Sequence, residues 1–355
     1  MANKMTPRER VAATIGGKKP DKLPIMVANS NTFICQYYGI SVEDFLTKPD
    51  LCAQGNINFI EEFEVDYCLT VNGYILYGCG PELGVRWEFV ENNFPGFVES
   101  PIKSEADLDK IKVPSEPSGY FAHYLNVIKQ VNDAIGEQYH LSVSILGPFA
   151  VACFLRGIED ALVDTIMNPD FFKAYMERCT ELSAYFGKNI LSTGLRSPIL
   201  NEIFLSPEMI RPDTYHSLIA PYDLEVQRRL GPENAPNSLA AFMGKPNDRE
   251  SQKGGASLYR AFYGVGESLD AIKAAMRYRL PGFPFPTSIS GRALNSWDSK
   301  EIIAFLKEAL DFLIQEEGLY PSITLISVQA ESQDNASDIA DKIKAIKAFR
   351  DEYKL

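Results

Sequence analysis

The sequence predicts an α/β fold, a closed (β/α)8 TIM barrel that forms a single domain over residues 1–355. Short apolar runs of strand length alternate along the chain with longer stretches of helical periodicity. Eight strand candidates can be counted, and eight strands suit a closed parallel barrel better than an open sheet. A chain of 355 residues is also long enough to build such a barrel around one core.

The first helix is indicated by the residues at its start. Thr6 can be the N-cap, Pro7 stands where its missing N–H is not needed, and Glu9 completes a capping box. The glycine pair at 16–17 ends this helix. Leu23–Ala28 follows as a short apolar run, typical of a strand that is buried on both faces.

The rest of the chain repeats this alternation. Asn168–Asp170 indicates the start of one helix, and Asp298 with Glu301 indicates the start of another. The other strand candidates are Val65–Val71, Tyr139–Leu146, Pro198–Phe204, Ser238–Met243, Phe283–Ile289, Ile323–Val328 and, more weakly, Leu258–Tyr263. The helical stretches are Asp50–Phe63, Pro169–Phe186, Pro212–Leu230, Glu267–Arg279 and Glu301–Gln315.

Two segments interrupt the alternation. Gly84–Ser100 contains the strand-like run Arg86–Val90 and several turn residues, so we expect a β-hairpin inserted in a loop after a strand. Pro101–Tyr120 is rich in proline, serine and charge, which predicts an exposed excursion of the same domain.

Composition excludes several classes of partner. With 45% hydrophobic and 23% charged residues, the chain has the composition of a soluble globular protein. Its net charge of −12 repels phosphate backbones and anionic lipids, so we expect no nucleic-acid partner and no membrane partner. No apolar run reaches the roughly 20 residues of a membrane helix. The polar residues 1–10 contain no signal-peptide core, so we expect a cytoplasmic location.

Cysteine and histidine spacing predicts neither a disulfide framework nor a familiar metal motif. The six cysteines lie far apart without a C-x-x-C pair and are expected to be buried apolar thiols. His140 begins a strand and so lies at the wrong end of a barrel, His123 falls in the excursion, and His216 falls inside a helix. None of the three is a convincing catalytic base or metal ligand.

Seven short motifs follow one another in a characteristic order. They are Arg8-Glu9-Arg10-Val11 followed by Pro20-Asp21-Lys22-Leu23-Pro24, Gly147-Pro148-Phe149, Leu205-Ser206-Pro207-Glu208 followed by Pro221-Tyr222, Ser290-Gly291-Arg292, and Ser327-Val328-Gln329. In order and spacing, the chain resembles the uroporphyrinogen decarboxylase superfamily, which includes the methylcobalamin:coenzyme M methyltransferases. The resemblance spans most of the chain and implies the barrel of that superfamily.

The residues after the first strand depart from the decarboxylase pattern. A tetrapyrrole decarboxylase resembling this chain would have arginines there to pair with propionates, whereas Ala28–Phe33 contains none. Tetrapyrrole decarboxylation is therefore disfavoured. A divergent uroporphyrinogen decarboxylase stays an alternative, and it would require Arg86, Arg196 and Arg292 to converge on the cavity.

The zinc motif of the similar coenzyme M methyltransferases is also absent. Those enzymes bind zinc through a His-x-Cys pair and a later cysteine. The corresponding positions here read Asn237–Phe242 and Gln329–Glu331, with no histidine or cysteine. A non-standard zinc site stays open.

The remaining match is to demethylating relatives. The resemblance then implies a corrinoid-dependent methyltransferase, which moves a methyl group from a small O- or N-methyl donor to the cobalamin of a partner corrinoid protein. It is compatible with a homodimer. A third alternative is a non-catalytic barrel that binds a ligand, and it predicts a plugged mouth or acids that point away from any pocket.

Candidate site residues follow from barrel geometry, because chemistry gathers at the carboxyl ends of the strands. Glu202 and Glu331 are the candidate catalytic proton donors, since the oxygen or nitrogen that loses its methyl group must be protonated. Helix capping by Glu202 and simple solvation of Glu331 are the structural alternatives. The candidate substrate-binding residues are Asn29, Asn31, Asn72, Tyr74, Gly147, Asn201, Arg292 and Gln329.

Overall fold

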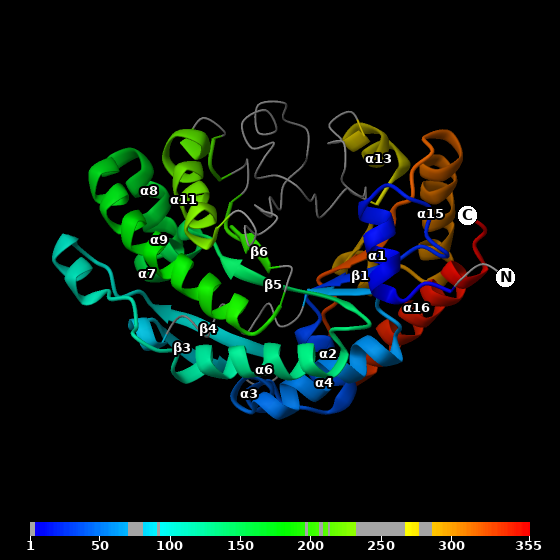
Figure 1. The fold of residues 1–355 in the computed structure, drawn as a ribbon, viewed down its shortest axis with the longest axis horizontal. Helices are drawn as coiled ribbons and strands as arrows, with labels where there is room; N and C mark the ends of the chain where they lie inside the picture. Colours follow the sequence, from blue (N-terminus) through cyan, green and yellow to red (C-terminus); the bar gives the residue numbers. More distant parts are fainter. Residues whose placement is uncertain are drawn as a thin grey trace.

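Six parallel strands form the central sheet. The computed structural model describes residues 4–69, 81–90, 93–195, 198–205, 209–211, 214–231, 267–276 and 286–355. The strands of the sheet are β1 (Ile25–Ala28), β2 (Tyr67–Leu69), β5 (His140–Leu146), β6 (Pro198–Asn201), β7 (Pro286–Ser290) and β8 (Ser322–Ile326). Their order is β6-β5-β2-β1-β8-β7. Figure 1 labels β6, β5 and β1 of this sheet. The first and last strands are therefore neighbours, as they must be when a sheet rolls into a barrel.

Each of these six strands overlaps a run that the sequence predicts to be a strand. The two other strand candidates, Ser238–Met243 and Leu258–Tyr263, lie outside the described residues. Closure of the sheet by eight strands therefore remains a prediction.

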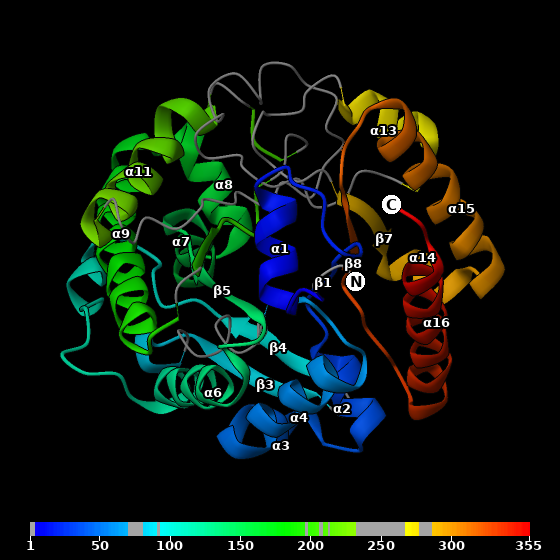
Figure 2. The same ribbon diagram turned by 45° about the vertical axis from the view of Figure 1, so that its right-hand side comes forward.

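Helices flank the strands of the sheet. They are α1 (Pro7–Ile15), α2 (Asn31–Tyr38), α3 (Val42–Thr47), α4 (Pro49–Glu62), α6 (Gly119–Ile135), α7 (Pro148–Arg156), α8 (Ile158–Met167), α9 (Pro169–Ser192), α11 (Ala220–Leu230), α13 (Leu269–Met276), α14 (Gly291–Ser296), α15 (Ser299–Asp311) and α16 (Gln333–Glu352), with short turns η1 (Pro81–Leu83), η2 (Glu105–Lys110), η3 (Tyr215–Ile219) and η4 (Phe312–Glu316). In Figure 2, α6, α9 and α11 lie on one side of the strands, and α13, α15 and α16 lie on the other. Among the helices that the structure describes, none is long and apolar enough to cross a bilayer.

Side chains of the strands alternate between the helices and the inside of the sheet. In β5, Ile145 faces α9, because a Cβ added at Gly187 would lie 3.2 Å from Ile145 Cδ1. Ser142 and Ser144 have the opposite parity, and both are buried. The inner side of β5 therefore carries small polar residues, whereas its outer side packs against a helix.

The excursion expected over Pro101–Tyr120 agrees with the structure to within two residues. Helix α6 begins at Gly119, so His123 lies in a helix and not in an exposed loop. The local density of proline and serine in 101–118 obscures the start of this helix. His140 lies at the start of β5, as expected, and His216 lies in η3.

A two-stranded hairpin follows β2 along the chain. Strand β3 (Arg86–Val90) pairs antiparallel with β4 (Asn93–Glu99), within the range where the sequence predicts a hairpin. Trp87 of β3 contacts Phe154 of α7 with ring centroids 5.5 Å apart, and Phe154 contacts Phe204 at 5.2 Å. These aromatic contacts hold the hairpin against α7, and through α7 against the loop that follows β6.

A buried ion-pair network closes the amino ends of the strands. Asp66, immediately before β2, is 1% exposed; its Oδ2 accepts hydrogen bonds from Ile25 N (2.8 Å) and Arg350 Nη1 (3.1 Å). Arg10 of α1 also pairs with Asp66, and its Nε lies 2.7 Å from Asp21 Oδ1. The network therefore ties α1, β1 and α16 to the start of β2.

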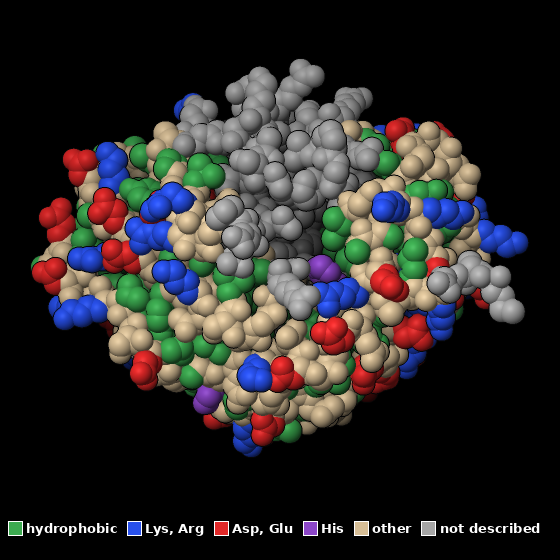
Figure 3. All heavy atoms as spheres, in the orientation of Figure 1, with side chains coloured by type: hydrophobic (Ala, Val, Ile, Leu, Met, Phe, Trp, Pro, Cys, Tyr) green, Lys and Arg blue, Asp and Glu red, His purple; other side chains and the backbone are tan. Residues whose placement is uncertain are grey.

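On the surface, lysine and arginine are intermixed with aspartate and glutamate on the face that Figure 3 shows.

Candidate active site

Three of the expected substrate-binding residues meet at the carboxyl ends of β1 and β8. The carbonyl oxygen of Asn29 accepts a hydrogen bond from Val328 N at 2.8 Å. Thr32 Oγ1 donates to Gln329 Oε1 at 3.0 Å. Asn31 begins α2, which starts directly after β1. Asn29, Asn31 and Gln329 therefore share one end of the sheet.

Asn29 and Asn31 each keep a buried polar atom without a partner. Asn29 has φ of 63°, the left-handed conformation that asparagine adopts more readily than most residues. Within the described ranges, its buried Oδ1 accepts no hydrogen bond, and Nδ2 of Asn31, a residue that is 1% exposed, donates none. Buried polar atoms without partners are rare in folded proteins and unfavourable. This acceptor and this donor are therefore suited to a neutral polar group of a ligand.

Gly147 and Asn201 meet at the carboxyl ends of β5 and β6. Gly147 N donates to the carbonyl oxygen of Asn201 at 3.0 Å, and Asn201 Nδ2 donates to Ser144 Oγ at 3.1 Å. Asn201 Oδ1 is buried and unpartnered, as is the hydroxyl of Ser288 in β7. Unpartnered neutral groups thus occur on or just after β1, β6 and β7.

Glu202, one of the two candidate proton donors, caps helix α7. Its Oε1 accepts from Phe149 N at 2.9 Å and its Oε2 from Ala150 N at 2.6 Å, and its side chain is 1% exposed. A carboxyl group is favoured there because the first N–H groups of a helix are free and the helix dipole is positive. Gly147 leaves room for it, since an added Cβ would overlap the Glu202 carboxyl group. Any proton chemistry of Glu202 must therefore involve a buried group.

Asp223 of α11 is the residue that the sequence reasoning missed. It is 2% exposed and lies at hydrogen-bonding range of Glu202, and Tyr215 Oη donates to its Oδ2 at 3.2 Å. Burial raises the pKa of Asp223 to about 7. Burial, together with the neighbouring Asp223, raises the pKa of Glu202 well above its ordinary value. The sequence did contain a signal that Asp223 is buried, because it falls in helical register with the apolar residues Ile219 and Leu230, which are buried.

The other two charged candidates lie on the surface. The Glu331 side chain is exposed, and its backbone N–H donates to Asn335 Oδ1 at 3.1 Å. The Arg292 side chain is 84% exposed and lies 3.5 Å from Glu267. Solvation, the structural alternative for Glu331, describes its position, and Arg292 forms a surface ion pair. Asn72 and Tyr74 lie outside the described residues.

The arginines that a tetrapyrrole site would need are not brought together in the described ranges. Arg86 lies in the hairpin, 3.8 Å from Glu99, and Arg292 pairs with Glu267 on the surface. Arg196 lies outside the described residues. The described part of the mouth is thus polar without a guanidinium cluster.

The described residues do not fit a zinc ion. Within those ranges, no group of three His, Cys, Asp or Glu side chains could hold a metal. Both oxygens of Glu202 already accept backbone N–H groups, which leaves Asp223 as its acidic neighbour. The segment Asn237–Phe242 lies outside the described residues.

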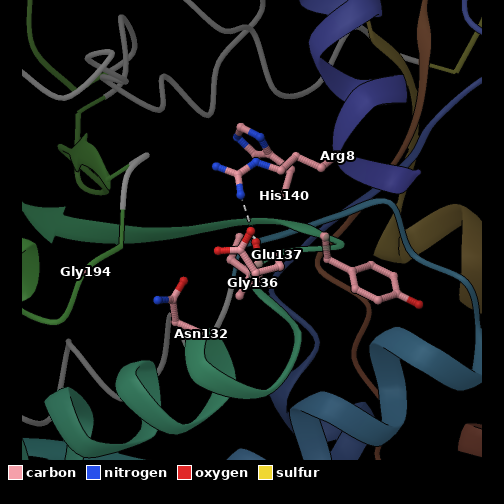
Figure 4. Close-up of a pocket in the computed structure, with 8 residues that line it drawn as sticks. Arg8, Asn132, Gly136, Glu137, His140 and Gly194 are labelled. Carbon is pink, nitrogen blue, oxygen red and sulfur yellow. Dashed lines mark hydrogen bonds between the residues drawn. The ribbon is translucent and has the colours of Figure 1, made fainter. Parts of the chain in front are cut away.

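A small pocket of about 70 Å³ lies at the opposite end of the strands (Figure 4). Arg8 donates from Nη1 to the carbonyl oxygen of Gly136 at 3.1 Å, at the carboxyl end of α6. Burial and the neighbouring Arg8 lower the pKa of His140 to about 4, so its imidazole is neutral at neutral pH. A positively charged side chain at the carboxyl end of a helix stabilises that helix, so this contact of Arg8 supports the fold. The pocket therefore belongs to the framework of the fold and not to the mouth.

Comparison with known proteins identifies a protein family. The family profile described as uroporphyrinogen decarboxylase (URO-D) matches residues 6–243. The chain is 23% identical over 226 residues to the methylcobamide:CoM methyltransferase MtaA of Methanosarcina barkeri, covering 61% of this chain and 64% of that protein. It is 25% identical over 202 residues to a uroporphyrinogen decarboxylase of Francisella tularensis subsp. holarctica, covering 52% and 56%. The matched region thus spans less than two thirds of each relative.

A solved structure extends the comparison to the whole fold. A methyltransferase from Methanosarcina mazei superposes with a TM-score of 0.73 over 97% of this chain and 99% of that chain, at 15% sequence identity. At this identity the likeness shows a shared fold.

Proposed function

Because this chain belongs to the uroporphyrinogen decarboxylase family, we propose that it is an enzyme of that family that acts as a corrinoid-dependent methyltransferase. It takes a methyl group from a small O- or N-methyl donor at the carboxyl ends of the strands. It gives that group to the cob(I)alamin of a partner corrinoid protein. Two of its relatives, at 23% identity, are named methylcobamide:CoM methyltransferases, which supports this branch of the family.

The observation that carries the proposal is the neutral polarity of the mouth. Asn29, Asn31, Asn201 and Ser288 present buried donors and acceptors without partners, and the described mouth holds no arginine cluster. A polycarboxylated tetrapyrrole would need guanidinium partners for its propionates. A small uncharged methyl donor needs only hydrogen bonds, which these groups can supply.

The reaction needs a proton at the leaving heteroatom. The methyl carbon forms its new bond to cobalt as its bond to oxygen or nitrogen breaks. The bonding electron pair stays on the heteroatom, which then takes up one proton. We propose that the Glu202–Asp223 pair beside Asn201, or Glu331 at the rim, supplies that proton.

A spectroscopic assay tests the proposed function. The chain is incubated with a reduced corrinoid protein and a panel of methoxylated and N-methylated compounds, and the absorbance change from cob(I)alamin to methylcobalamin is followed. We expect turnover with at least one neutral donor. No change across the panel, together with carbon dioxide release from uroporphyrinogen, would establish the decarboxylase alternative instead.

Replacing Asn31 with alanine separates binding from stability. The change removes a buried donor that has no partner among the described residues, so we expect the free energy of unfolding to change by less than about 1 kcal/mol. If the Nδ2 group binds the methyl-donor substrate, its loss raises the KM for that substrate about tenfold, which corresponds to the loss of one hydrogen bond. KM and the denaturation midpoint are measured on the same preparation. A large loss of stability with unchanged KM would contradict the role of Asn31.

A further inference from the structure

The carboxyl groups of Glu202 and Asp223 have an incomplete set of hydrogen bonds if both are ionised. Glu202 accepts two backbone N–H groups, and Asp223 Oδ2 accepts the hydroxyl of Tyr215. Asp223 Oδ1 is buried and has no donor. The two carboxyl groups lie at hydrogen-bonding range, yet two carboxylates cannot bond to each other without a proton.

We propose that Glu202 and Asp223 share one proton, carried by Oδ1 of Asp223 and donated to Glu202, and that this proton fastens the end of β6 to α7 and α11. Asp223 is thereby a positioning residue for the mouth. Its bond to Glu202 holds the residue after Asn201 against the amino end of α7. The inference rests on the contacts of the pair and does not require the proposed methyl transfer.

Hydrogen-bond geometry places the charge on Glu202. Its 2.6 Å contact with Ala150 N is short, as is typical of a charged acceptor, and both its oxygens face the positive end of a nine-residue helix. Among the described residues, Asp223 has only the Tyr215 hydroxyl as a donor, so its second oxygen can carry the proton. One proton at this position gives every oxygen of the pair a hydrogen bond.

The neighbouring elements supply no cation to replace that proton. From α7 and α9, the pair is faced by the thiols of Cys153 and Cys179, whose pKa values are raised by burial and by the charge of Glu202. From η3, it is faced by the Tyr215 hydroxyl. In the described ranges, neither carboxyl group forms an ion pair with a lysine, arginine or histidine. Loss of the proton would therefore leave two like charges in a buried site, which is strongly unfavourable.

The pH dependence follows from the raised pKa values. The two acids share a proton that Asp223 binds more tightly in the folded chain than in the unfolded chain, so unfolding releases it between about pH 4 and pH 7. Their contribution to stability is complete below the ordinary carboxyl range. It is lost as pH rises through about 7, the pKa of Asp223.

Two amide substitutions locate the proton. Asp223→Asn places a permanent N–H donor opposite Glu202 and keeps an oxygen for Tyr215, so it mimics the proposed protonated state. Glu202→Gln turns an amide N–H toward the backbone donors of α7. At pH 6 we expect Asp223→Asn to have the same thermal unfolding midpoint as the unsubstituted chain. Between pH 6 and pH 9 the midpoint of this variant should not decline, whereas that of the unsubstituted chain should. Glu202→Gln should lower the midpoint by about 5 °C at every pH.

Glu225→Gln is the matched control on the same helix. Glu225 pairs with Arg228 and Arg229, which hold its pKa at about 2, so it does not titrate between pH 5 and 9. This variant should retain the alkaline decline of the unsubstituted chain. If instead Glu202→Gln is tolerated and Asp223→Asn is not, the proton lies on Glu202 and the proposal is wrong. The proposal is equally wrong if both variants keep the original pH profile.

A direct measurement covers the case in which a variant does not fold. NMR of the unsubstituted chain, labelled at the aspartate carboxyl carbon, should show an aspartate that is still protonated at pH 6. Its signal is assigned by its shift in Tyr215→Phe, which removes only the hydroxyl that donates to Asp223. Absence of such a signal would overturn the shared proton. Because neither readout uses a methyl donor, failure here is distinct from failure of the proposed function.

Discussion

Arg350→Ala is expected to lower the free energy of unfolding by about 3–5 kcal/mol, the usual effect of removing one partner of a buried ion pair. Arg350 is fully buried, and its guanidinium contacts Asp66 at 3.1 Å. Without it, Asp66 keeps Arg10 and the N–H of Ile25, but part of its buried charge is left uncompensated. Because the network joins α16 to the start of β2, the change loosens the last helix from the first strands.

Denaturant unfolding measures this effect, with Lys347→Ala as its control. Lys347 is a neighbour on α16 that pairs with Glu64 at 2.7 Å, but both side chains are partly exposed. Its loss should change stability by less than about 1 kcal/mol. Similar losses of stability for the two variants would show that burial does not determine how much an ion pair contributes to stability. The site at the carboxyl ends should keep its contacts in Arg350→Ala, because the network lies at the amino ends.

Local sequence patterns predicted the framework because its signals lie within a few residues. Thr6 and Glu9 form the expected capping box of α1, and Asp298 and Glu301 form that of α15. Apolar runs of strand length likewise located the six described strands. Asn168 shows the limit of such signals, because its side chain bonds to Asp164 and not to the helix it precedes.

The candidate site was predicted less completely because its contacts join distant segments. The order of strands and loops was enough to expect Asn29 and Gln329 at one end of the barrel, and both lie at the ends of the neighbouring strands β1 and β8. Nothing local couples Glu202 to Asp223, which lies 21 residues later on another element. The state of Arg292 likewise depends on Glu267, which no local pattern links to it.

Gly147→Ala is expected to lower the free energy of unfolding by about 3 kcal/mol, because overpacking and a broken buried hydrogen-bond network each contribute. Gly147 has φ of −68°, which alanine also adopts, so backbone strain plays no part. The cause is the overlap of the new Cβ with the carboxyl group of Glu202. To make room, Glu202 must leave the N–H groups of Phe149 and Ala150, and its contact with Asp223 is then lost as well.

Gly96→Ala in the hairpin is the control for Gly147→Ala. At Gly96 an added Cβ meets, among the described residues, Val90 at 3.8 Å and a backbone oxygen at 3.9 Å, which are ordinary contacts. This change should alter stability by less than about 1 kcal/mol.

A double-mutant cycle between Gly147→Ala and Glu202→Ala isolates the contact itself. Once the Glu202 side chain is absent, the Cβ at position 147 has nothing to overlap. The two losses should therefore fall short of additivity by about 1 kcal/mol or more. Additive losses would mean that alanine at 147 acts on the backbone of the β5–α7 turn. In that case the carboxyl group of Glu202 would be held in place by something other than its packing against Gly147.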